Sequence, residues 1–203
     1  GLLDEFVAIC AVYAVLRVLC VCTMANHAER TALADVMAAA FRFINHTASD
    51  RYASHMLREI GCADEAGLVV IVNIFYWAQA KRFQSGQALV NALRVACDFI
   101  KAGGYTNVMI DLANEYCIRL FEAHPLVNSE EGMAHLIELA KEWSGVPVGA
   151  SSADAMVHPQ VIAASDYVLI HGNALTRGEF FRYATKIRSL AGDKPVVCNE
   201  DSP

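Results

Sequence analysis

The chain lacks the glycine-rich and basic patterns by which nucleotide- and nucleic-acid-binding proteins are recognised. No GxGxxG or GxxxxGK turn follows an apolar segment, so the fingerprints of a dinucleotide fold and of a phosphate loop are both missing. No run of lysine and arginine is longer than the dipeptide Lys81-Arg82, and the formal net charge is −6. Because nucleic-acid binding needs concentrated positive charge, the sequence argues against nucleic acid as a partner.

The chain also lacks cysteine pairs with metal-binding spacing. It has seven cysteines but no CxxC motif, and Cys20 and Cys22 have no nearby histidine or cysteine pair that would complete a zinc site. Most of the cysteines lie in apolar sequence, where a free thiol behaves as a small hydrophobic group. We therefore expect buried thiols in a reducing compartment, which slightly favours the cytoplasm, and we expect no cofactor.

Apolar residues are abundant: 55% of the 203 residues are hydrophobic and 19% are charged. This length and composition predict a single domain over residues 1–203 with a large core. The segment Phe6–Ala25 carries no charge except Arg17 and approaches the length of a membrane span. Because a charge near the centre of a span is costly in lipid, a membrane role is disfavoured, and the role of residues 1–50 stays open.

Apolar segments and helical patterns alternate along the rest of the chain. Five strands are predicted to begin at residues 68, 107, 146, 167 and 195. The helices expected between them cover Gln87–Lys101, Ser129–Trp143, Pro159–Ala164 and Thr176–Leu190. This alternation indicates parallel βαβ units, and without a nucleotide fingerprint it favours an α/β fold of the (β/α)8 TIM-barrel type.

Polar and aromatic side chains follow the predicted strands, where active sites of such barrels lie. Two glutamates stand out, because each is preceded by asparagine and each closes an apolar strand: Glu115 and Glu200. Cleavage of a glycosidic bond needs an acid and, opposite it, a base or nucleophile. The other strand-end groups suit a carbohydrate cleft, and they are Tyr76, Trp77, Gln79, Asn114, His171, Asn173 and Asn199.

Four segments resemble the clan A glycoside hydrolases, in particular a poorly characterised, cellulase-like branch: GLVVIVNIFYWAQ, YTNVMIDLANEY, DYVLIHGN and KPVVCNED. The resemblance covers about Ser54–Pro203 and implies barrel strands three to seven of an incomplete barrel. It also implies a retaining mechanism with Glu115 as acid/base and Glu200 as nucleophile. Asn114 would hold the sugar 2-hydroxyl, and His171 would line the site.

Two other interpretations stay open. Asp111, Glu115, His171 and Glu200 offer ligands for Mg²⁺ or Mn²⁺, as in a metal-dependent isomerase or lyase. The chain would otherwise be an inactive, truncated barrel that binds sugar. Geometry separates retention from inversion, since the two carboxyl groups lie about 5–5.5 Å apart in retaining enzymes and ~6.5–9.5 Å apart in inverting ones. The sequence leaves open the sugar, the linkage and the oligomeric state.

Overall fold

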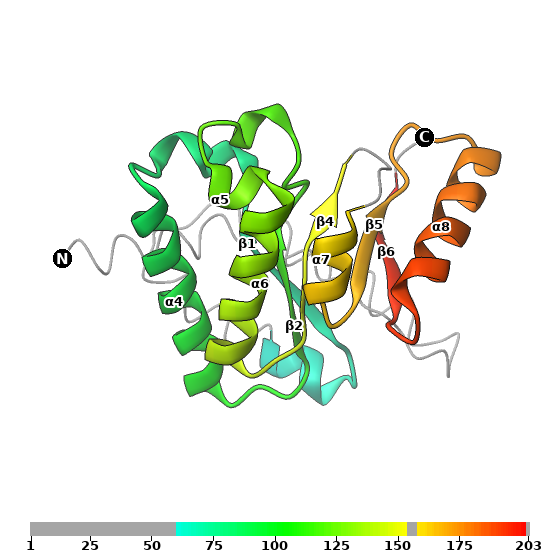
Figure 1. Ribbon diagram of the computed structural model, residues 1–203. Coiled ribbons are helices and arrows are strands. Elements are labelled where there is room, and N and C mark those ends of the chain that lie inside the picture. Colours follow the sequence, from blue (N-terminus) through cyan, green and yellow to red (C-terminus); the bar gives the residue numbers. More distant parts are fainter. Residues whose placement is uncertain (1–59, 154–157, 202–203) are drawn as a thin grey trace.

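The computed structural model describes residues 60–153 and 158–201, except for the side chains of Gln79, Lys81 and Arg82 (Figure 1). The strands form two parallel, three-stranded sheets. The first sheet contains β1 (Val70–Phe75), β2 (Val108–Ala113) and β3 (Val148–Gly149), and the second contains β4 (Ser151–Ser152), β5 (Val168–His171) and β6 (Val196–Glu200). In both sheets the strands follow one another in chain order.

Helices connect the strands. In the first sheet the connections contain η1 (Trp77–Arg82), α4 (Gly86–Gly103), η2 (Arg119–Phe121), α5 (Pro125–Asn128) and α6 (Glu130–Ser144). In the second they contain α7 (Pro159–Ala164) and α8 (Arg177–Ala191). All five predicted strand segments are therefore confirmed, although the third is divided, and the four predicted helices lie within two residues of their expected ends.

The predicted TIM barrel is wrong. The strands form two separate sheets, and no strand of the described residues pairs with the outer edge of β1 or of β6, so the barrel does not close. The division falls at Ala150, between β3 and β4. There the backbone N–H of Ser151 donates to Oδ1 of Asp111 at 3.1 Å instead of to a backbone carbonyl of β2, which ends the ladder between β2 and this segment.

Local sequence explains where the helices begin and end. The side chains of Ser85 and Ser129 accept hydrogen bonds from the first turns of α4 and α6, and Thr176 with Glu179 forms a capping box on α8. Gly104 and Gly145 end α4 and α6 at φ angles of 65° and 72°, which glycine adopts without steric cost.

The core has three clusters on two faces of the strands. The largest packs the first sheet against α4 and α6, and a second packs β5 and β6 against α7 and α8. The third lies on the opposite face and joins the two sheets through Ile71, Met109, Tyr167, Leu169 and Val197. This third cluster forms the apolar floor beneath the polar groups described below.

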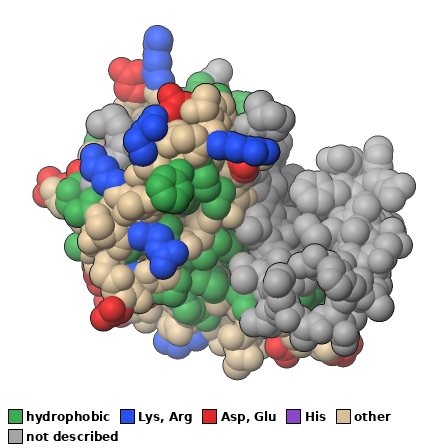
Figure 2. Space-filling model, turned by 90° about the vertical axis from the view of Figure 1, so that its right-hand side faces the viewer, with side chains coloured by type: hydrophobic (Ala, Val, Ile, Leu, Met, Phe, Trp, Pro, Cys, Tyr) green, Lys and Arg blue, Asp and Glu red, His purple; other side chains and the backbone are tan. Residues whose placement is uncertain are grey.

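α8 buries one side and exposes the other. Tyr183 and Ile187 pack toward β5 and β6, whereas Phe181 is 71% exposed. Figure 2 shows this side of the molecule, where lysine and arginine side chains lie scattered among apolar ones. No described helix is long and apolar enough to cross a membrane, and the predicted Phe6–Ala25 segment lies outside the described residues.

The four described cysteines are free, and only Cys97 is fully buried. Burial raises the pKa of the Cys97 thiol to about 12, so this side chain stays protonated at neutral pH. Cys62 is exposed, and Cys117 and Cys198 are half-buried. The expectation of buried thiols therefore holds for one of these four residues.

Gly149→Ala is expected to destabilise the protein, because an added Cβ would lie 2.6 Å from the backbone oxygen of Tyr167. Tyr167 cannot move freely, since its hydroxyl donates to the Ile110 carbonyl at 2.8 Å. We expect a loss of about 1–3 kcal/mol in the free energy of unfolding, measured by urea denaturation. Gly178→Ala is the matched control, because its Cβ would meet only the flexible end of Arg182. Equal stability of the two variants would contradict this packing.

Candidate active site

A layer of buried polar side chains lies beyond the apolar floor, toward the carboxyl ends of the strands. Asn73 and Asp111 follow Ile71 and Met109 by two residues and are paired across β1 and β2, so they share the face of the third cluster. Ser151 lies opposite Leu169 on that same face, and His171 follows Leu169 by two residues. All four side chains are buried, in keeping with a site that is built on strands rather than on loops.

A β-bulge brings Glu200 opposite His171. Leu169 pairs with Val197 and Ile170 with Cys198, but His171 pairs with Glu200, so Asn199 is the extra residue. In an unbroken ladder Asn199 would lie opposite His171, and the next residue would point to the other face. The bulge therefore directs the Glu200 carboxylate toward the polar layer, a common use of bulges next to active sites.

Glu115 reaches the same place from the first sheet through an unusual backbone conformation. Its φ angle is 56°, in the left-handed region that costs a side-chain-bearing residue roughly 1–2 kcal/mol. Its backbone N–H donates to Oγ of Ser151 at 3.2 Å, which offsets part of this cost. The chain thus turns directly after β2 and presents the carboxylate toward the second sheet.

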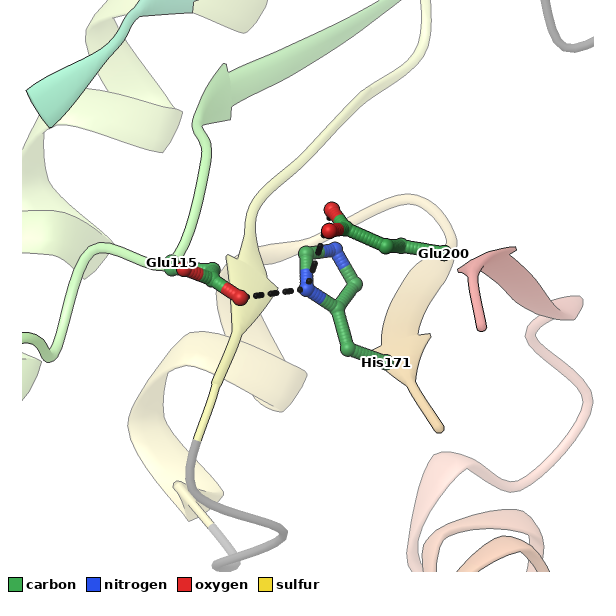
Figure 3. Close-up of side chains that lie close together, drawn as sticks. All are labelled: Glu115, His171 and Glu200. Atoms are coloured by element: carbon green, nitrogen blue, oxygen red, sulfur yellow. Dashed lines mark hydrogen bonds and ion pairs between the residues drawn. The ribbon is translucent and has the colours of Figure 1, made fainter. Parts of the chain in front are cut away.

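His171 bridges the two glutamates (Figure 3). Its Nδ1 lies 3.1 Å from Oε1 of Glu115 and 3.5 Å from Oε2 of Glu200. An ionised carboxylate only accepts hydrogen bonds, so the Nδ1–H tautomer of His171 can donate to Glu115 at this distance. The histidine side chain is 1% exposed, whereas the two glutamate side chains are 20% and 22% exposed. Both carboxylates therefore remain within reach of a ligand.

The two carboxylates are close together. One carboxylate oxygen of Glu115, one ring nitrogen of His171 and one carboxylate oxygen of Glu200 all lie within 4.8 Å of one another. One carboxylate oxygen of Glu115 and one of Glu200 therefore lie no more than 4.8 Å apart. Asn173 fixes the second carboxylate, because its Nδ2 donates to Oε1 of Glu200 at 3.0 Å.

The other predicted site residues lie directly after β1 and β2 or within β6. Phe75 is paired with Ala113, so Tyr76 and Trp77 leave β1 beside the Asn114-Glu115 segment. The rings of Tyr76 and Trp77 lie 5.2 Å apart, and Trp77 is 38% exposed. Asn114 and Asn199 are buried. The predicted contact from Gln79 falls outside the described side chains.

Three buried polar atoms near the bulge have no hydrogen-bond partner among the described residues. They are Nε2 of His171 and the Oδ1 atoms of Asn173 and Asn199. The two amide oxygens are acceptors. Buried acceptors ordinarily have hydrogen-bond donors, and the described residues do not supply donors to these two oxygens.

Asp111 does not join the group that was predicted as a four-residue metal site. Asp111 is 2% exposed. Its carboxylate accepts hydrogen bonds from Nδ2 of Asn73 at 3.2 Å and from the backbone N–H and Oγ of Ser151, both at 3.1 Å. Together with burial, its charge raises the pKa of the Tyr167 hydroxyl well above the usual value, so that hydroxyl stays a donor at neutral pH.

Sequence reasoning missed the roles of Asn73 and Ser151. Asn73 is the only polar residue in the apolar run VVIVNIF, and this was the available signal. Nothing in the sequence around Ser151 indicates that it contacts both Asp111 and Glu115. Their separation of about forty residues from their partners hides such contacts from sequence periodicity.

The fold and this group define an α/β protein with a histidine-bridged carboxylate pair at the carboxyl ends of its strands. Comparison with protein-family models, with curated proteins and with solved structures gives no match to the chain. The resemblance of the four sequence segments to clan A hydrolases therefore remains a prediction.

Proposed function

We propose that the protein is a retaining glycoside hydrolase that uses Glu115 as acid/base and Glu200 as nucleophile. The observation that carries the proposal is the closeness of the two carboxylates: an oxygen of Glu115 lies within 4.8 Å of an oxygen of Glu200. Both side chains are partly exposed, and both are held by described neighbours, so a ligand would meet a preorganised pair.

In the first step Glu115 donates a proton to the leaving oxygen while a carboxylate oxygen of Glu200 attacks the anomeric carbon. The bond to the leaving group breaks, and an ester between the sugar and Glu200 forms. In the second step the Glu115 carboxylate takes a proton from water, whose oxygen attacks the same carbon and releases Glu200. Two inversions restore the original configuration.

His171 and the amides organise this chemistry in the proposal. The imidazole donates from Nδ1 to Glu115 and lies between the two carboxylates, which moderates their mutual repulsion. The side-chain amide of Asn173 donates a hydrogen bond to Oε1 of Glu200 and fixes the plane of that carboxylate. Asn114, Asn199, Tyr76, Trp77 and Gln79 are the proposed sugar contacts, with Asn114 on the 2-hydroxyl as the resemblance implies.

A divalent-cation enzyme, an isomerase or lyase, is the second candidate. Adjacent octahedral ligands at about 2.0–2.1 Å from Mg²⁺ lie about 3 Å apart, and Nδ1 of His171 lies 3.1 and 3.5 Å from its two carboxylate neighbours. The observation that weakens this candidate is the engagement of Asp111 with Asn73 and Ser151, which leaves three ligands instead of four.

Covalent trapping tests the two candidates against each other. A panel of dinitrophenyl 2-deoxy-2-fluoro glycosides, with different sugars, is expected to add one sugar to the protein at Glu200, as read by peptide mass spectrometry. Labelling should persist in EDTA and be lost in Glu200→Gln. Glu142→Gln, an exposed glutamate on α6, is the control that should label normally. Absence of labelling, together with Mn²⁺ binding that Glu115→Gln and Glu200→Gln both abolish, would favour the metal-dependent enzyme.

A further inference from the structure

We infer that Asp111 and Ser151 act as a positioning pair that holds Glu115 against His171. The name acid/base for Glu115 rests on the proposed function, but the positioning itself rests only on contacts between described residues. The pair lies behind the site, because Asp111 is 2% exposed and Ser151 is 0% exposed. Neither residue needs to touch the substrate for this role.

Asp111 fixes both polar ends of Ser151. Its Oδ1 accepts the backbone N–H and its Oδ2 accepts the hydroxyl, both at 3.1 Å. Asn73 donates to the same Oδ2 at 3.2 Å and so fixes the carboxylate from the other side. A hydroxyl has one proton and two lone pairs. Because that proton points to Asp111, or to the more distant Ala113 carbonyl at 3.3 Å, the Ser151 oxygen is free to accept.

Ser151 in turn holds the turn that carries the acid. Its Oγ accepts the Glu115 N–H, and its backbone carbonyl accepts the Tyr116 N–H, both at 3.2 Å. Two successive amides after β2 are therefore bound to one residue. Because these amides belong to the peptide planes on either side of the Glu115 Cα, holding both of them stabilises the positive φ of Glu115.

The contacts cross between the two sheets. Asp111 and Glu115 belong to β2 and the turn after it, in the first sheet, whereas Ser151 is the first residue of β4, in the second. β4 pairs with β5, which ends at His171, and β5 pairs with β6, which ends at Glu200. The Asp111–Ser151 bonds thus set the register between the sheet of the acid and the sheet of the histidine and nucleophile.

Ser151→Ala tests the pair, with Ser165→Ala as the matched control. Ser165 is also buried, and its hydroxyl donates only to the Val161 carbonyl in α7 at 2.7 Å. Nitrogen NMR of the His171 ring reads the Glu115 contact directly and needs no substrate. We expect Ser151→Ala to shift the Nδ1 signal toward that of Glu115→Gln, and Ser165→Ala to leave it unchanged.

Kinetics give a second readout that general destabilisation would not produce. Ser151→Ala should slow the first step about 10- to 100-fold for aryl glycosides with poor leaving groups, which need the proton. The dinitrophenyl glycosides need no proton, so their first step should keep the wild-type rate. If the wild-type protein hydrolysed none of the glycosides, the proposed function would be contradicted. The His171 nitrogen signal would still show whether Asp111 and Ser151 position Glu115.

Asp111→Asn covers the case in which Ser151→Ala does not fold. This variant keeps the shape of the side chain but places an amide group among donors from Ser151 and Asn73, so we expect the same displacement of the His171 signal. A wild-type His171 signal in either folded variant would overturn the inference. So would equal loss of rate with good and poor leaving groups.

Discussion

Glu200→Ala should abolish the covalent intermediate and lower the turnover of an activated aryl glycoside by about 10⁴-fold or more. The reason is that this carboxylate, set opposite His171 by the bulge at Asn199, is the proposed attacking group. Azide or formate should enter the vacated space and restore part of the turnover. Because a single displacement then occurs, the product should have the inverted configuration, which NMR of the anomeric proton identifies.

Glu142→Ala is the matched control for this prediction, since it removes an exposed carboxylate from α6 without touching the site. It should keep wild-type turnover and show no response to azide. A rescued Glu200→Ala product of retained configuration would show that another group attacks the sugar. Retention would therefore remove Glu200 from the role of nucleophile.

Glu115→Ala should separate the two chemical steps. A dinitrophenyl leaving group needs no proton, so the first step should survive and the glycosyl-enzyme should accumulate. The second step should slow by about 10²- to 10⁴-fold, because no base remains to activate water. Azide needs no deprotonation, so it should restore turnover and give a product of retained configuration.

The contrast between the two glutamate variants is the decisive measurement. Rescued Glu115→Ala and Glu200→Ala should give opposite anomers from the same substrate, because azide enters after one inversion in the first variant and before any in the second. Identical anomers would contradict the assignment of roles. Equal loss of activity with no rescue, in an enzyme whose wild-type turnover depends on Mg²⁺ or Mn²⁺, would instead support the metal-dependent candidate.

Short-range signals explain why the strands and helices were predictable. The capping side chains of Ser85, Ser129 and Thr176 and the terminal Gly104 and Gly145 fix the helix ends through contacts within a few residues. The barrel prediction failed for the opposite reason. Closure depends on pairing between strands far apart in sequence, and the Asp111 contact to the Ser151 backbone ends the ladder at Ala150.

The candidate site was predictable in its members but not in its geometry. Glu115, His171, Asn173 and Glu200 were recognised because they close apolar strands, and the structure joins all four by hydrogen bonds or ion pairs. Asp111 was also recognised, but as a metal ligand. A sequence shows that a carboxylate lies two pleats before Glu115, yet it does not show which donors will surround that carboxylate.

The sequence by itself determined the alternation of parallel strands and helices and the placing of polar residues at strand ends, because hydrophobic period and capping act within one element. Tertiary structure alone decided three features: the division into two sheets, the bulge that turns Glu200 toward His171, and the backbone of Glu115 that Ser151 holds. Each of these depends on a hydrogen bond between segments far apart along the chain. Such a bond forms only after the strands have packed and excluded water from the donors and acceptors concerned.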